Sequence, residues 1–315
     1  MTSFKKNLTN GLLAGATMFT TASAHSATIG TFDGTTVKIG GYIKMDAISS
    51  SYSDGALASG NIGRDFYVPS LTPVGGTEQN RTFDMHARQT RFNIGTDSKI
   101  DGHKLKTFIE LGFLATPDGN ERITNSYEPR MRHAFLVFDN WLFGQTWATF
   151  QNVASLPETA DFIGNTDFGI FVRQTQVRYT MGDFQFSAEN PESTITPFGG
   201  VTQANPRIVS DDNELPDFVA RYNFKADKLS LVMAFLVRQL TYNDGAAIDD
   251  SITSFGASFT GKVMLGKDDI RFGVNTGSGM GRYIGLNVAN GAVIDANGEL
   301  EAIDSTAVYA AYRHL

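Results

Sequence analysis

The feature that most constrains how this chain can fold is an alternation of apolar and polar residues that recurs along its length. The clearest run is residues 229–238, where the odd positions carry Leu, Leu, Met, Phe and Val. Residues 104–114 and 253–265 repeat the pattern, with mainly charged or hydroxyl side chains on the opposite face. Because successive side chains of a strand point to opposite faces, this period of two predicts β-strands with one apolar face each.

The alternation predicts twelve strands, at residues 36–48, 86–97, 104–114, 130–138, 141–149, 172–181, 184–190, 217–224, 229–241, 253–265, 270–278 and 305–315. Most of these runs are as long as a tilted membrane strand, which has about 9–11 residues. Strands of soluble proteins are typically shorter, at about five or six residues. The lengths therefore favour a sheet that crosses a membrane.

The connections between the predicted strands alternate between short and long. Short links lie at 98–103, 139–140, 182–183, 225–228 and 266–269, and long polar loops lie near 49–85, 115–129, 150–171, 191–216, 242–252 and 279–304. Tight periplasmic turns and long outer loops are typical of a transmembrane barrel. All nine prolines fall within the long loops or at their edges, as expected if the strands are hydrogen-bonded on both sides. The predicted fold class is therefore all-β: a transmembrane, antiparallel, up-and-down β-barrel of the porin type.

The amino terminus has the form of a secretory signal. Lys5 and Lys6 precede a weakly apolar stretch at 12–19, and the small residues Ala22, Ser23 and Ala24 follow it. This arrangement predicts a signal peptide at 1–24 that is cleaved near Ala24. The remaining chain divides into an amino-terminal extension at 25–35 and a barrel domain at 36–315. We expect the mature protein in the outer membrane of a Gram-negative-type bacterium.

Charge and composition exclude several classes of function. The net charge of -7 becomes -7 - 2 = -9 once Lys5 and Lys6 are removed, which argues against binding to nucleic acid. The chain has no cysteine, so no disulfide contributes to its fold. The sequence has no nucleotide-binding or hydrolase fingerprint, and its five histidines lack the spacing of metal ligands. These observations predict a protein without cofactor or metal that is not an enzyme.

If the apolar face of each strand meets lipid, the other face lines the pore. A charge on the lipid face costs about 2–4 kcal/mol near the middle of the membrane, so basic strand residues are expected inside. Rings of such residues favour anions, although each arginine could instead pair with a nearby carboxylate and only stiffen the wall. The candidates for pore lining and anion binding are Lys44, Arg91, Lys106, Arg130, Arg132, Arg178, Arg221, Arg238 and Arg271.

The loop at 150–171 is unusually amphipathic, because it combines Phe and Leu residues with three carboxylates. Folded into the lumen, it would narrow the pore and set Glu158, Asp161 and Asp167 against the basic wall. The transverse field between the two charges would orient passing zwitterions and dianions. The alternative is a loop that packs on a neighbouring subunit.

Several segments together resemble one known family. They are KIGGYIKMD at 38–46, ARQTRF at 87–92, the hairpin from RHAF at 132–135 to GQTW at 144–147, and PETADF at 157–162 followed by RQTQVRY at 173–179. In this order they resemble the DcaP-like porins, and the resemblance covers most of residues 36–315. It implies a homotrimeric, sixteen-stranded channel specific for dicarboxylates and other small anions.

The sequence departs from that family pattern at both ends. Family members often carry a periplasmic helical extension before the barrel, for which the residues between Ala24 and Val37 leave no room. They also continue beyond the segment at 311–314, so about four strands are expected to be missing and the visible barrel to be incomplete.

The function predicted from the sequence is a passive diffusion channel for small solutes, with small anions such as dicarboxylates preferred, outer-membrane lipid around it and a homotrimer as its assembly. Two alternatives remain open. A barrel-based outer-membrane enzyme would need His86 or His133 beside a serine in a Ser-His-acid arrangement. A secreted soluble β-protein, such as a glycan-binding module, would show the same alternation of residues.

Overall fold

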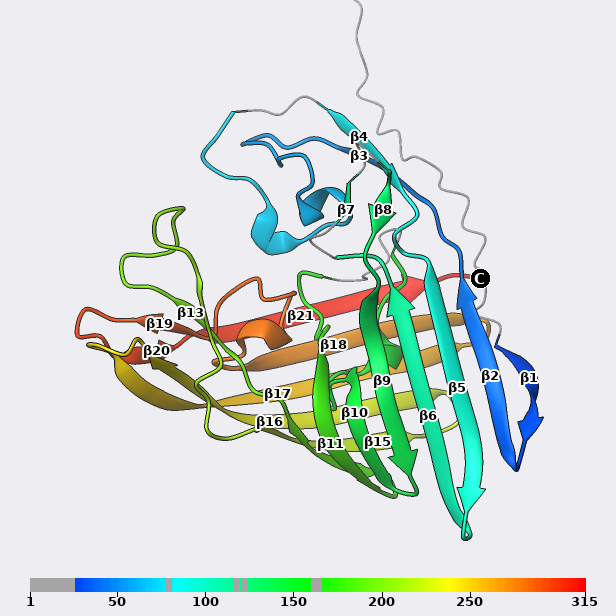
Figure 1. Ribbon diagram of the computed structural model, residues 1–315. Helices are drawn as coiled ribbons and strands as arrows, with labels where there is room; N and C mark the ends of the chain where they lie inside the picture. Colours follow the sequence, from blue (N-terminus) through cyan, green and yellow to red (C-terminus); the bar gives the residue numbers. More distant parts are fainter. Residues whose placement is uncertain (1–25, 78–80, 116–118, 121–123, 160–165) are drawn as a thin grey trace, which may run out of the picture.

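The computed structural model describes residues 26–77, 81–115, 119–120, 124–159 and 166–315. Thirteen strands in this part of the chain form one antiparallel sheet that curls into an open barrel (Figure 1). In sheet order they are β1 (Ala27–Phe32), β2 (Thr35–Tyr42), β5 (Arg91–Ile100), β6 (His103–Gly112), β9 (Arg130–Phe138), β10 (Trp141–Trp147), β11 (Arg173–Met181), β12 (Phe184–Glu189), β15 (Asp217–Lys225), β16 (Leu229–Asn243), β17 (Asp249–Leu265), β18 (Asp268–Ser278) and β21 (Asp304–Arg313).

All twelve predicted strands are present, and the all-β antiparallel fold is confirmed. Each main strand pairs with the next main strand along the chain, and β1 and β21 form the two free edges. Two of the tight turns, Asp33-Gly34 and Asp101-Gly102, have positive φ at both residues. Such turns match the right-handed twist of the strands that they join, and Asp-Gly is a preferred sequence for them.

Helix is almost absent. The described helices are single 3-10 turns at η1 (Ile62–Arg64), η2 (Pro69–Leu71), η3 (Val153–Ser155) and η4 (Gly281–Tyr283). Within the described residues, none reaches the length and apolar character that a membrane-spanning helix requires.

The predicted first two strands differ from the observed ones. The run predicted at 36–48 ends in the sheet at Tyr42, and the chain then forms β3 (Asp46–Ser50), which pairs with β4 (Thr82–His86) in a separate hairpin. The run predicted at 86–97 correspondingly joins the sheet only at Arg91, because the chain turns at residues 87–90, where the Thr90 amide donates to the Ala87 carbonyl. The segment at 25–35, predicted as an extension, contains β1.

The long loops carry structure of their own. Four short strands, β13 (Ser193–Thr196), β14 (Ile208–Ser210), β19 (Ala292–Ile294) and β20 (Leu300–Ala302), form a second sheet at the long-loop end of the barrel (Figure 1). Ile195, Leu240 and Leu300 are buried in the core that joins this sheet to β16 and β17. The loops at 191–216 and 279–304 are therefore folded against the barrel.

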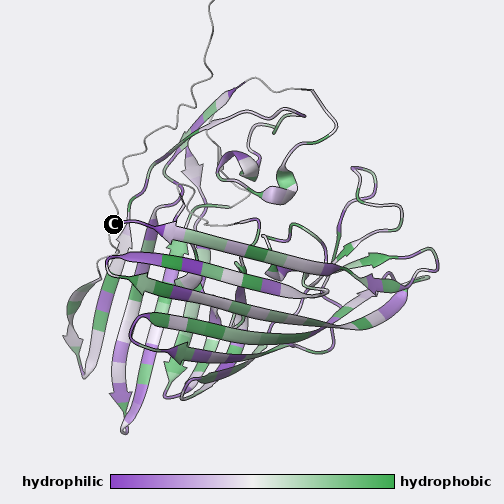
Figure 2. Cartoon of the chain, turned by 180° about the vertical axis from the view of Figure 1, so that it is seen from behind, coloured by the Kyte–Doolittle hydropathy of each residue, from purple (hydrophilic) through white to green (hydrophobic). Residues whose placement is uncertain are grey.

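The outer face of the sheet is apolar. Phe235, Phe255 and Val308 are 62%, 56% and 59% exposed, and Figure 2 shows hydrophobic positions alternating with hydrophilic ones along the strands. Aromatic rings gather near the tight turns, including Trp141 over Tyr179 at 4.7 Å and Phe184 over Tyr222 at 4.8 Å between ring centroids. An apolar band bordered by aromatic rings is typical of a barrel wall in lipid.

Candidate functional site

The candidate site is the lumen, and the loop at 150–171 enters it. Phe150 is completely buried there, with its ring 5.8 Å from that of Tyr283. Ile170, Leu236 and Met280 complete an apolar core on the inner side of the sheet. We refer to residues 148–159 and 166–171 as the lumen segment, which packs against the wall formed by β15, β16, β17, β18 and β21.

Polar contacts hold the first part of the lumen segment to this wall. The Arg221 guanidinium donates to the carbonyls of Thr149 and Gln151, at 3.3 and 2.5 Å. The Asn152 amide donates to Thr260 Oγ1 at 3.0 Å. Arg221 therefore satisfies backbone carbonyls of a non-helical segment that would otherwise be unpaired inside the barrel.

A second group of contacts lies at the tight-turn end of the lumen. Arg271 donates to the Leu156 carbonyl at 2.5 Å and to Glu158 Oε1 at 3.2 Å. Arg313 reaches the same Glu158 oxygen at 2.5 Å, and the completely buried Asp269 accepts from both arginines. This four-residue group is named the lower ion cluster.

A third group closes the long-loop end of the same wall. Arg238 pairs with Asp217 at 3.2 Å, and both side chains are almost completely buried. Arg238 also donates to the Glu192 carbonyl, and the Tyr283 hydroxyl donates to Asp217 Oδ2 at 2.9 Å. Burial raises the pKa of the Tyr283 hydroxyl well above its ordinary value, so it stays protonated and can donate. These contacts fasten the loop at 279–304 to the barrel.

The opposite wall has a different arrangement of charge. Arg132 Nε and Arg91 Nη1 lie 2.7 and 3.5 Å from Glu110 Oε1. Arg173 lies with its guanidinium 3.9 Å from the centre of the Trp147 ring, and its Nε and Nη2 atoms are buried without a hydrogen-bond partner among the described residues.

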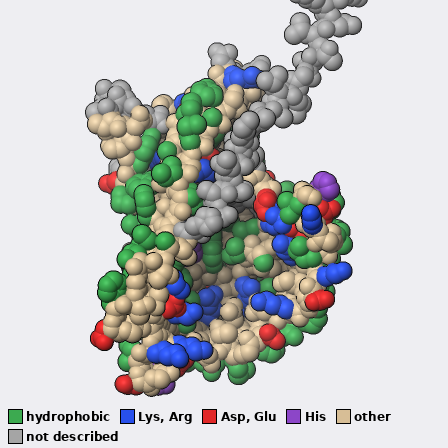
Figure 3. All heavy atoms as spheres, turned by 90° about the vertical axis from the view of Figure 1, so that its right-hand side faces the viewer, with side chains coloured by type: hydrophobic (Ala, Val, Ile, Leu, Met, Phe, Trp, Pro, Cys, Tyr) green, Lys and Arg blue, Asp and Glu red, His purple; other side chains and the backbone are tan. Residues whose placement is uncertain are grey.

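Together with Arg130, these three arginines form what we name the basic cluster: Arg91, Arg130, Arg132 and Arg173. Arg130, Arg132 and Arg173 line a cavity of about 440 Å³ at the long-loop ends of β6, β9 and β11, whose other walls include Phe66 and Phe171. Figure 3 shows the side of the molecule between the two free edges, where Lys and Arg side chains gather in the hollow of the barrel.

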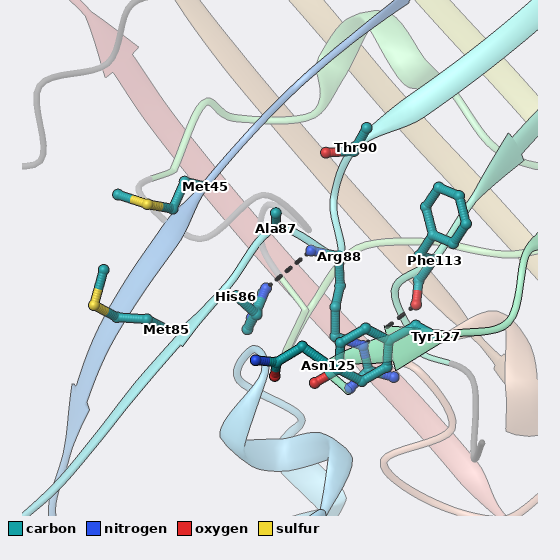
Figure 4. A pocket seen from close by; sticks show the side chains of 9 residues that line it. All are labelled: Met45, Met85, His86, Ala87, Arg88, Thr90, Phe113, Asn125 and Tyr127. Carbon is teal, nitrogen blue, oxygen red and sulfur yellow. Dashed lines mark hydrogen bonds between the residues drawn. The ribbon is translucent and has the colours of Figure 1, made fainter. Parts of the chain in front are cut away.

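A larger cavity, of about 540 Å³, lies beside the β3–β4 hairpin (Figure 4). Its arginine, Arg88, pairs with the buried Asp65 and lies 4.2 Å from the centre of the Tyr127 ring. His86 Nδ1 accepts from the Arg88 amide, and its Nε2 lies 3.1 Å from the Asp65 carbonyl. The charge of Arg88 is therefore balanced locally by Asp65.

The other predicted pore residues occupy varied positions. Lys44 lies in the link between β2 and β3 and pairs with Asp46 at 2.7 Å. Lys106 is exposed near the tight turns and lies 3.3 Å from Asp97. Arg178 is half-buried, and it makes no ion pair or hydrogen bond with a described residue.

Two of the three predicted acidic residues of the loop are described, and they have different partners. Glu158 belongs to the lower ion cluster, and Asp167 accepts from the Tyr67 hydroxyl at 3.0 Å. Asp161 lies outside the described residues. Sequence reasoning also passed over Arg173 and Arg313, although each lies in a predicted strand.

The residues that an enzyme would need have other partners. His133 Nδ1 lies 3.0 Å from Thr146 Oγ1, and among the described residues neither His133 nor His86 hydrogen-bonds to a serine. No group of His, Asp and Glu side chains in the described segments has the arrangement of a metal site.

Comparison with known proteins identifies the family. The profile of the DcaP outer membrane protein family matches residues 7–306. The crystal structure of the outer membrane channel DcaP of Acinetobacter baumannii matches with a TM-score of 0.67 at 22% identity, over 87% of this chain and 72% of that one.

Other solved structures are less similar. An anion-selective porin from Comamonas acidovorans has a TM-score of 0.46 at 8% identity, over 78% of this chain and 68% of that one. A loop-deletion variant of OmpT from Vibrio cholerae has a TM-score of 0.45 at 13% identity, over 78% and 70% of the two chains. No curated protein matches the sequence. The family match covers nearly the whole chain, and the chain therefore belongs to the DcaP outer membrane protein family, as a porin of the outer membrane.

Proposed function

We propose that this porin passes small anions in preference to cations, with dicarboxylates as the first substrate class. The observation that carries the proposal is the basic cluster, in which Arg91 and Arg132 lie within 3.5 Å of Glu110 and Arg130, Arg132 and Arg173 line a cavity of about 440 Å³. Arginine suits this role because its planar guanidinium can bind a carboxylate through two parallel hydrogen bonds.

The strength of such a site is compatible with passage. Two unit charges 4 Å apart attract by about 1 kcal/mol in water and by roughly 4 kcal/mol near a protein surface. Several cations of this strength raise the local concentration of anions, while each contact stays weak enough to break as the solute moves on. The two separate carboxylates of a dianion could contact two arginines of the cluster at once.

The homotrimer is likewise a proposal, supported by the resemblance of the sequence to DcaP-like porins. A trimer of channels would insert into a planar bilayer as a unit and conduct in three equal steps.

Ion selectivity tests the proposal directly. We expect the reversal potential in a potassium chloride gradient to report a higher permeability for chloride than for potassium. Liposome swelling should be faster with dicarboxylates than with uncharged sugars of similar size. A reversal potential of the opposite sign, that of a cation-selective channel, would refute the preference for anions.

A further inference from the structure

The two carboxylates of the lower ion cluster differ in how deeply they are buried. Asp269 is completely buried and accepts from Arg271 and Arg313 at 2.8 and 2.5 Å. Glu158 contacts the same two arginines, but its side chain is 59% exposed. One carboxylate is thus a fixed part of the wall, and the other reaches the cluster from the lumen segment.

The geometry at Glu158 is that of a bound carboxylate ligand. Its Oε1 lies 3.2 Å from Arg271 Nη2 and 2.5 Å from Arg313 Nη1, between two guanidinium groups that come from neighbouring strands. Charge-assisted contacts of this kind are the ones by which arginines recognise carboxylates. A carboxylate of any origin in this position would meet the same donors.

The wall would hold these donors in place without Glu158. Asp269 pairs with both arginines, and Lys262 lies 3.5 Å from its Oδ2. Arg271 and Arg313 are only 11% and 28% exposed, so the wall restricts their conformations. Among the described residues, three cationic side chains then lie within 3.5 Å of Asp269, and this excess of positive charge favours a second carboxylate.

The lumen segment would also remain attached without Glu158. The Leu156 carbonyl accepts from Arg271 at 2.5 Å, and Ser155 Oγ lies 2.8 Å from the Tyr309 hydroxyl. The ring of Tyr309 lies over Gly273, where a Cβ would come within 2.4 Å of it. These contacts hold the backbone beside the cluster, so release of one exposed carboxylate does not require the segment to leave the wall.

We propose that Arg271 and Arg313 form a carboxylate-binding station at the tight-turn end of the lumen, and that Glu158 occupies it as an internal ligand which a carboxylate solute displaces. The inference rests on the proposed passage of anions and adds a second point of contact, at the opposite end of the lumen from the basic cluster. Competition with Glu158 keeps the solute from binding tightly, which a channel requires if the solute is to leave.

Single-channel recording with succinate as the probe tests this competition. Glu158→Gln removes the charge of the internal ligand while keeping its size, so succinate should block the channel for roughly two- to threefold longer per event. Glu192→Gln is the matched control, because Glu192 is also a partly exposed carboxylate paired with an arginine, Arg282. The control should leave the block duration unchanged.

A double variant tests whether the longer block comes from the station or only from the loss of a negative charge in the lumen. Adding Arg313→Gln to Glu158→Gln should return the block duration to the wild-type value or below it. If Glu158→Gln leaves the block duration unchanged or shortens it, the proposed station is wrong. This holds even if the reversal potential shows that the channel selects anions. Wild-type selectivity for cations would instead refute the proposed function on which the station rests.

Discussion

The two walls of this barrel use the same residue type for different purposes. On the wall of β15 to β21, Arg221, Arg238 and Arg271 donate to backbone carbonyls of segments that fold into or over the lumen. On the wall of β5 to β11, Arg130, Arg132 and Arg173 of the basic cluster line a cavity, and Arg91 and Arg132 lie beside Glu110. The position of an arginine on the inner face therefore does not by itself assign it to solute binding or to structure. What distinguishes the two walls is what their arginines contact: carbonyls of loop segments on one wall, and a cavity and Glu110 on the other.

The largest effect, a loss of stability, is expected from replacing Arg238. Arg238→Met leaves the buried Asp217 without its closest cation, and breaking a buried pair in this way costs about 3–5 kcal/mol. Urea-induced unfolding of the reconstituted protein should report a loss of stability of this size. Asp217→Asn combined with Arg238→Met should recover part of it. A single variant as stable as the wild type would show that the Arg238–Asp217 pair does not stabilise the wall of β15 to β21.

The next largest effect is expected from Gly273→Ala. The new methyl group would meet the Tyr309 ring at 2.4 Å, and overpacking of this kind costs about 1–3 kcal/mol. The same shift of Tyr309 should break its contact with Ser155 and alter the single-channel conductance. Ala257→Gly is the control, because it also changes a strand residue by one methyl group but adds no bulk. Gly245→Ala cannot serve, because Gly245 has a positive φ. Unchanged conductance in Gly273→Ala would show that the position of Tyr309 does not set the width of the conducting pathway.

A smaller effect, mainly on selectivity, is expected from neutralising two arginines on the wall of β5 to β11. Arg91→Gln and Arg178→Gln together should lower the ratio of chloride to potassium permeability by roughly threefold, because two positive charges leave the lumen. Arg221→Gln, on the wall of β15 to β21, should lower stability more than selectivity. If the reversal potential is unchanged in the double variant Arg91→Gln and Arg178→Gln, both arginines have structural roles instead.

The smallest effect is expected from Lys106→Gln. Lys106 is 62% exposed and its pair with Asp97 spans 3.3 Å, and exposed pairs contribute about 0–1 kcal/mol. Urea unfolding should therefore detect little change. A loss as large as that of Arg238→Met would contradict the view that exposure, rather than the presence of a salt bridge, determines these energies.

Much of the fold was predictable because local rules determine it. The period of two gave the apolar face of β16, and the short links at 139–140 and 182–183 are the observed turns. The break after Tyr42 was not predictable in this way. A Cβ at Gly41 would meet the Arg91 carbonyl at 2.1 Å, so the bend depends on a close approach between two strands that are 49 residues apart in the sequence.

The candidate site was less predictable than the fold. Arg173 lies at the first position of β11 and Arg313 at the last position of β21. Alternation assigns such residues to a face but cannot say what lies above that face. The stack of Arg173 on Trp147 depends on the register of β10 with β11, and a long loop between two strands leaves that register unspecified. The contacts of Arg221 and Arg271 depend on the path of the lumen segment. The alternation of apolar and polar residues predicts strands but not the path of a long loop.

The apolar core inside the barrel has an electrical consequence. Phe150, Leu236, Met280 and Tyr283 exclude water from one side of the lumen, and such material is far less polarisable than the solution that fills the rest. Electric field lines from the basic cluster are therefore confined to the remaining aqueous path, where the potential falls off more slowly than in open water. A few arginines on one wall can then act on an ion along much of its route.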